Sequence, residues 1–444
     1  MDCRTWMVAL AALMAPVVSI SSSLAADCAC VQKKCRCVSS CPPSPCPPSQ
    51  YYQAPSGQVP SDQDPQAPMV PMGDMPMSDD LTQPADDLPA MPLPASTFAT
   101  STQFASASEG MGFRDATIGD FFGNTALISG PSYGSTQPDQ GFNMPLGGGD
   151  RRYKITENVS PIPVDRWFVN YNHFANPVRN ISGDSVDVDR VTVGLEKTIL
   201  NGSSSLELRV PFVSGLNATQ QTGQLGDQTG SEIGNMNLIF KTILVQCGDR
   251  SALTAGITLN LPTAKDGLLL DGTGNTISAI ENESVHLLPF VAYFRQHTSR
   301  TWSTAIIQLD FDLNGSTFYL PGDGGPDVGF GRYQEQNFLY LDYTLGHWFY
   351  EDICQTAFIR RAAVLGELHY STTINDTDRS SAGPTAGDIV TNPFNRIDVL
   401  NATAGLRFQL GDNYLLTAAA VVPLKDEENK LFDSEFALLL TRRF

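Results

Sequence analysis

The chain has 444 residues, of which 41% are hydrophobic and 17% charged, and its formal net charge is −19. An acidic chain without clustered Lys and Arg does not neutralise phosphate backbones, so nucleic acid is excluded as a partner. The one long apolar run lies near the N-terminus, which excludes a helical membrane protein. A membrane β-barrel is not excluded, because its strands need only about 9–11 residues each.

Residues 1–26 are predicted to be a secretory signal peptide. Arg4 supplies the positive start, an apolar run follows from Met7 to Ile20, and small residues precede the cut after Ala26. The run is shorter than the ~20 residues of a membrane-spanning helix. Cys28 follows an aspartate, where a lipoprotein signal requires a small residue, and this disfavours lipid anchoring. We therefore expect the mature chain to leave the cytoplasm.

Residues 27–50 form a Cys-rich segment, and residues 51–110 form a Pro-rich linker. In an exported chain an even number of cysteines predicts disulfides, either within the segment or to another molecule. The segment lacks His and the Cys-x-x-Cys spacing of zinc sites, so we expect no metal. The linker has too few aliphatic residues to bury a core and is expected to be a disordered tether in the periplasm. The disulfide candidates are Cys28, Cys30, Cys35, Cys37, Cys41 and Cys46.

Residues 111–164 precede the first predicted strand, and two interpretations stay open for them. Apolar residues such as Phe121, Phe122, Ile128 and Phe142 suit a plug that packs into or under the mouth of a barrel. The alternative is a loosely ordered periplasmic lead-in.

Residues 165–444 are predicted to form about twelve strands. Apolar and polar residues alternate along them, as in Leu206 to Phe212, so one face of each strand meets an apolar medium. The links between strands alternate between short turns and long polar loops. A soluble sandwich has no reason to alternate in this way, whereas an outer-membrane barrel places turns in the periplasm and loops outside. The expected strands are 166–174, 188–199, 204–213, 232–246, 251–262, 284–295, 301–313, 335–345, 362–371, 397–410, 413–422 and 434–444.

Aromatic residues near the strand ends are expected to form girdles at the two membrane surfaces. One link departs from the alternation, because the segment between Gly346 and Arg361 is long where a short turn is expected. We predict that part of it extends a strand or forms a small periplasmic helix. The girdle candidates are Trp167, Tyr171, Tyr293, Trp302, Tyr343 and Trp348.

The last strand carries apolar residues at every second position and ends in an aromatic residue. This pattern resembles the signal that the barrel-assembly machinery reads in outer-membrane proteins. The fold class is therefore predicted as all-β, a transmembrane antiparallel up-and-down β-barrel in outer-membrane lipid. The residues of the expected signal are Phe436, Leu438, Leu440 and Phe444.

The polar faces of the strands would line the lumen of such a barrel. Charges of both signs facing inward would suit a channel for small solutes. A sealed, salt-bridged interior that transports nothing is the alternative. The predicted pore-lining residues are Arg190, Glu196, Glu207, Arg209, Lys241, Asp310, Asp312, Asp342, Glu367, Arg407 and Glu435.

Several short stretches of the barrel region resemble the outer-membrane transporters related to the meta-pathway of phenol degradation. They are Leu206 to Phe212, Gly234 to Phe240, Thr258 to Thr263 and Gly405 to Pro423, together with the final Phe. The resemblance covers about residues 167–444 and implies a transport barrel without naming a solute. The Cys-rich and Pro-rich front third lies outside it.

An enzymatic function is not expected. Tyr171, His173 and Ala175 are similar in spacing to the active strand of outer-membrane phospholipase, but the position of the nucleophilic hydroxyl holds an alanine. The other histidines show no metal-binding spacing, so no cofactor is expected. The sequence thus predicts a passive porin-like channel in the outer membrane, with its N-terminal segment in the periplasm. A structural envelope protein, anchored by the barrel and cross-linked through its cysteines to itself or the cell wall, is the alternative.

Overall fold

The structure is a computed structural model. It describes residues 116–121, 126–129, 141–144, 152–179, 185–215, 218–221, 231–247, 250–319, 329–352, 357–376, 380–382, 388–391, 396–425 and 429–444. All of them belong to one compact unit, Ala99–Phe444. The expected signal peptide, Cys-rich segment and Pro-rich linker lie outside the described residues. Within those residues, no helix is long and apolar enough to cross a membrane.

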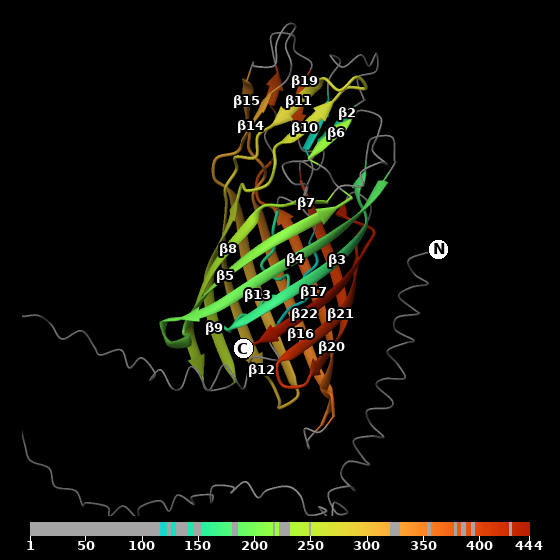
Figure 1. Cartoon of the computed structure of the whole chain (residues 1–444). Coiled ribbons are helices and arrows are strands. Elements are labelled where there is room, and N and C mark those ends of the chain that lie inside the picture. Colours follow the sequence, from blue (N-terminus) through green and yellow to red (C-terminus); the bar gives the residue numbers. More distant parts are fainter. Residues whose placement is uncertain are drawn as a thin grey trace, which may run out of the picture. The chain divides into compact units, whose positions relative to one another are not determined.

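Twelve antiparallel strands close into a β-barrel, as the sequence predicted (Figure 1). Each strand pairs with the next along the chain, and the last strand closes the barrel by pairing with the first, Arg443 lying opposite Arg166. The strands are β3 (Arg166–Arg179), β4 (Ser185–Ile199), β5 (Ser204–Ser214), β8 (Met236–Cys247), β9 (Ser251–Leu261), β12 (His286–Gln296), β13 (Thr301–Asp312), β16 (Phe338–Glu351), β17 (Ile359–Thr373), β20 (Asp398–Leu410), β21 (Tyr414–Pro423) and β22 (Ser434–Arg443).

The two ends of the barrel differ in the length of their connections. At the turn end, where β3 begins and β22 finishes, the links are short, such as the single 3-10 turn η2 (Leu200–Gly202) and the three residues 411–413. At the loop end the links are long and carry further short strands (Figure 1). These are β6 (Thr219–Gln221), β7 (Ser231–Ile233), β10 (Gly267–Leu270), β11 (Thr276–Ile280), β14 (Ser316–Tyr319), β15 (Gly329–Tyr333), β18 (Ser380–Ala382) and β19 (Asp388–Thr391).

The barrel wall is apolar outside and polar inside. Leu195, Leu208 and Ile307 are exposed on the outer face. Glu207 and Arg209, which flank Leu208 in the sequence, are buried. Because side chains on a strand point to opposite faces in turn, one period-two pattern builds both surfaces. An outer face that is apolar and an inner face that is charged are the arrangement of a transmembrane barrel and the reverse of a soluble one.

In three places an inward-facing glycine lies opposite an aromatic residue of the neighbouring strand, whose ring covers it. A Cβ atom at any of the three glycines would lie only 2.0–2.3 Å from the ring. The wall can therefore carry a large ring at these points only because the partner has no side chain. The pairs are Gly194 with Phe168, Gly256 with Phe290, and Gly346 with Trp302.

Of two expectations about the β13–β16–β17 region, one needs correction and the other is confirmed. Trp302 and Trp348 do not belong to a membrane girdle, because both are buried inside the barrel with their rings 5.3 Å apart. Part of the long link after Gly346 extends the strands, which was one of the two predicted alternatives, since β16 continues to Glu351 and β17 begins at Ile359. Cys354 lies outside the described residues.

Candidate functional site in the barrel lumen

Two segments that precede the first barrel strand lie inside the barrel. We call residues 116–121 the first arm and residues 152–164 the second arm of a lumen hairpin; every residue of both arms is buried. The arms bond to each other, since the Thr117 amide donates to the Val159 carbonyl at 3.0 Å and the Asn158 amide to the Ile118 carbonyl at 3.3 Å.

Between the arms, the chain forms β1 (Ala126–Ser129) and β2 (Gly141–Met144). These two strands pair with each other, and β1 also pairs with β19 of a loop-end connection. The second arm then runs towards the turn end, where the Val164 amide donates to Glu196 at 3.1 Å. The hairpin therefore extends through the lumen, and the pairing of β1 with β19 holds its tip at the loop end.

The second arm presents its two basic side chains to acidic groups on one side of the lumen. Lys154 Nζ lies 2.7 Å from Asp120 Oδ1 and 2.6 Å from Asp342 Oδ1. The Arg152 guanidinium lies 2.8 Å from Glu335 Oε2 and 3.3 Å from Asp310 Oδ2. All six side chains are nearly free of solvent. Each cation is thus held by two carboxylates, which offsets the cost of removing it from water.

On the opposite side of the lumen, basic side chains meet the acidic residue of the same arm, while Glu196 and Glu207 of that wall pair with its other bases. Glu157 Oε1 lies 2.8 Å from Arg190 Nη2, and the Glu157 main-chain carbonyl accepts a hydrogen bond from Arg209. Lys241 donates in the same way to the carbonyl of Ser160. The hairpin therefore bonds to charged side chains on both walls.

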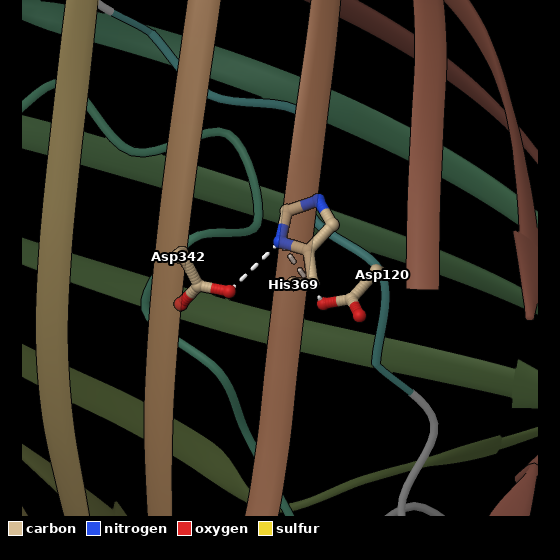
Figure 2. A group of neighbouring side chains, drawn as sticks. All are labelled: Asp120, Asp342 and His369. Atoms are coloured by element: carbon tan, nitrogen blue, oxygen red, sulfur yellow. Dashed lines mark hydrogen bonds and ion pairs between the residues drawn. The ribbon is translucent and has the colours of Figure 1, made fainter. Parts of the chain in front are cut away.

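A cluster of ionisable groups joins the first arm to the barrel wall. Asp120, Asp342 and His369 converge from the first arm, β16 and β17 (Figure 2). His369 Nδ1 lies 2.8 Å from Asp342 Oδ1 and 3.4 Å from Asp120 Oδ1. Nearby, Glu367 accepts hydrogen bonds from the main-chain amides of Ile118 and Gly119. These contacts fix the first arm to β17.

The three ligand atoms of this cluster lie within 4.8 Å of one another, close enough to hold a metal ion. The Lys154 ammonium, however, contacts both carboxylates of the set. A divalent ion placed there would face that ammonium at short range, and such repulsion is costly in a site without solvent. The donor set therefore fits a network of ion pairs better than a metal centre.

All eleven residues predicted to line the pore are buried. Seven of them bond to the hairpin: Arg190, Glu196, Arg209, Lys241, Asp310, Asp342 and Glu367. The other four bond to residues of the barrel or of its loops: Glu207 to Arg166, Asp312 to the Glu335 amide, Arg407 to Thr417, and Glu435 to Asn172. A role of these residues in conduction remains a prediction.

Strand periodicity does not reveal the residues that the hairpin contributes. Asp120, Arg152, Lys154 and Glu157 lie in irregular sequence with no period, so no alternation marks them. Arg166 could have been found, because it is in phase with the inward residues of β3. It bridges two carboxylates, Glu196 at 2.8 Å and Glu207 at 3.0 Å.

Near the loop end, the outer face of β3 and β4 carries a small polar group. Asp189 Oδ1 accepts a hydrogen bond from the Tyr171 hydroxyl at 2.7 Å and lies 2.9 Å from His173 Nδ1. This is the stretch whose spacing is similar to a phospholipase strand. Ala175, next on the same face, offers no nucleophile, so the group supplies a base and an orienting carboxylate without a hydroxyl to activate.

The terminal strand places its expected assembly signal on the lipid side. Phe436, Leu438 and Phe444 are exposed on the outer surface, and Leu440 shares their face. Near the same end Asp165, which leads into β3, accepts hydrogen bonds from Lys197 and from the amide and hydroxyl of Thr198. Partial burial alone would raise the pKa of Asp165, but these hydrogen bonds outweigh it and hold that pKa below its ordinary value.

No family model matches this chain, and no curated protein matches its sequence. Solved outer-membrane channels are similar in fold. An outer-membrane channel of Pseudomonas putida F1 is 14% identical, covers 64% of this chain and 97% of its own, and has a TM-score of 0.42. The porin NanC is 8% identical, the match covers 63% of this chain and 98% of NanC, and the TM-score is 0.34. The Pseudomonas putida toluene transporter TodX is 11% identical, the match covers 62% of this chain and 88% of TodX, and the TM-score is 0.34.

At these identities and scores the likeness concerns the fold alone, and the fold itself is established by the strand pairing. The resemblance to the transporters of the phenol degradation pathway stays a prediction.

Proposed function

We propose that this chain is a porin-like channel of the outer membrane through which small solutes move passively when the lumen hairpin shifts. The supporting observation is how the lumen is filled. The side chains of the barrel strands contact a separate segment through ion pairs and hydrogen bonds, seven of the eleven predicted pore residues among them.

Contacts of this kind suit a reversible closure. Water can replace an ion pair or a hydrogen bond when the hairpin leaves. The hairpin also packs apolar side chains such as Ile118, Phe121 and Ile155 against the wall, so its movement exposes some hydrophobic surface as well. Twelve strands also enclose more space than an eight-stranded barrel, whose interior side chains alone can fill. On this proposal the present arrangement is the closed state.

The alternative is a structural envelope protein for which the barrel is only an anchor. The observation that favours it is the near-complete pairing of the buried charges, since a sealed interior would look the same. In that case the barrel-assembly signal and a cysteine cross-link to the cell wall or to another copy would be the functional features. The two proposals differ in whether the hairpin ever leaves.

A reversible lock on the first arm separates them. A Cβ atom at Gly405 would lie 2.7 Å from Ile118 Cδ1, so the two positions are neighbours and suit a cysteine pair. In a background without other cysteines, the oxidised double variant should conduct less in a planar bilayer than the same protein after reduction. The single variant Ile118→Cys is the matched control and should not respond. If the folded barrel carries no current in either redox state, the structural envelope protein is the better proposal.

A further inference from the structure

The wall that receives Lys154 has the chemistry of an ammonium site. Besides its two carboxylate partners, Lys154 Nζ donates to the Ser371 hydroxyl at 3.4 Å and lies 5.4 Å from the centre of the Tyr340 ring. Carboxylate oxygens, a hydroxyl and an aromatic face all favour a cation, because the ring face carries partial negative charge.

The adjacent position has the chemistry of a guanidinium site. In addition to its two carboxylates, Arg152 donates from Nη2 to the Gln336 carbonyl at 2.7 Å. Its guanidinium carbon lies 4.3 Å from the centre of the Phe338 ring. Acceptors in the plane and a ring on the face are what a planar cation requires.

The two positions form one continuous surface. Phe338 and Tyr340 lie two residues apart on β16, and their rings stack with centres 5.6 Å apart and planes at 7°. We call Asp310, Glu335, Phe338, Tyr340 and Asp342 the acid-aromatic wall. Every member belongs to the barrel or its loop, so the wall keeps these acceptors and rings when the hairpin moves. It then loses both cations and also Asp120, which belongs to the first arm.

We propose that the acid-aromatic wall binds small organic cations, molecules that carry a primary ammonium or guanidinium group, and that Lys154 and Arg152 occupy it as internal ligands. This inference rests on the proposed channel function, because a solute reaches the wall only through a lumen that opens. It names the solute class of that same site. An incoming cation would replace the side chain it resembles and so favour the shifted hairpin.

Chemical rescue tests the wall directly. Truncating the internal ligand in Lys154→Ala or Arg152→Ala removes that cation from its carboxylates and leaves room for a small one, while His369 and His286 keep their contacts with Asp342 and Asp310. Ethylammonium should raise the thermal midpoint of Lys154→Ala, and ethylguanidinium that of Arg152→Ala, each by about 2–4 °C at a concentration well above its dissociation constant. The exposed Lys265→Ala variant is the control, with sodium chloride at equal ionic strength as the reference. A shift no larger than that of sodium would overturn the inference.

A second measurement on the unaltered protein covers the case in which the variants fail to fold. In planar bilayers n-butylammonium should permeate better than its isomer tetramethylammonium, which has the same atoms but cannot donate a hydrogen bond. If the protein conducts but shows no such preference, the inference about organic cations is wrong and the proposed channel function is unaffected. If the variants are rescued but no current is seen, the wall binds organic cations and the proposed channel function is wrong.

Discussion

Replacing Lys154 with methionine tests whether the ion pairs hold the hairpin. Methionine keeps most of the apolar stem and removes the charge. The ammonium lies 2.7 and 2.6 Å from two carboxylates, and the side chains of all three residues are at most 1% exposed. Removing one partner of a buried ion pair costs about 3–5 kcal/mol. His369 still faces both carboxylates, so we expect the lower end, about 3 kcal/mol.

Urea unfolding in lipid vesicles measures this loss, with Lys265→Met as the matched control. Lys265 is 77% exposed and 3.6 Å from Glu232, so its loss should cost about 0–1 kcal/mol. Adding Asp120→Asn to Lys154→Met should restore part of the stability, because it removes one of the carboxylates left without a partner. The reasoning would be refuted if Lys154→Met cost no more than Lys265→Met, or if the two hairpin substitutions were additive.

Four further predictions follow from other parts of the molecule. Deleting Phe444 should prevent assembly of a heat-modifiable barrel in the outer membrane, and a folded barrel at normal levels would contradict the assembly signal. Non-reducing gels should show oligomers that disappear when the six cysteines from Cys28 to Cys46 are replaced, whereas monomer under both conditions would exclude cross-linking between molecules. Gly346→Val should impair assembly because its side chain meets the Trp302 ring, while Gly366→Val, which meets nothing within 4 Å, should not; equal yields would be the contrary result. Hydrogen bonds lower the pKa of Asp165, so its contribution to stability is present at neutral pH and lost as pH falls. Asp165→Asn should therefore lower the urea midpoint at pH 7 and reduce the drop of that midpoint between pH 7 and pH 3. Parallel pH curves for the variant and the unaltered protein would contradict this.

The structure also decides what a change of charge at Arg209 would do. If Arg209 only lined an open pore, as the sequence predicted, Arg209→Glu would alter ion preference with little effect on folding. Arg209 is buried and bonds both to Glu207 and to the hairpin. A glutamate there would place two acidic groups side by side without solvent, so we now expect a folding defect rather than a clean change of selectivity.

The barrel could be predicted from the sequence because its strands have a period of two and one lipid-facing side. That pattern identified all twelve strands and put the eleven charged candidates on the buried face. Trp302 was misassigned although the same rule would have placed it correctly, since it is in phase with the inward Thr304. An aromatic residue near a strand end suggests a girdle, but the phase of the strand decides which face the residue lies on.

The hairpin could not be derived in the same way. Its main-chain groups bond to side chains far along the chain, such as the Ile118 amide to Glu367 and the Ile155 amide to Gln308 at 2.7 Å. Such contacts leave no local period, so the sequence left the plug and the lead-in as equal alternatives. Only the closed barrel brings the partners of Arg152 and Lys154 together.

The central claim is that the lumen conducts when the hairpin no longer fills it. The most direct test is single-channel conductance in planar bilayers, measured for the full chain and for a chain without residues 27–150, which lacks the first arm and the tip but keeps Arg152 and Lys154. We predict larger and more frequent current steps for the shortened chain, with both proteins shown to be folded by heat modifiability. Two folded barrels with the same conductance, or with none, would contradict the account.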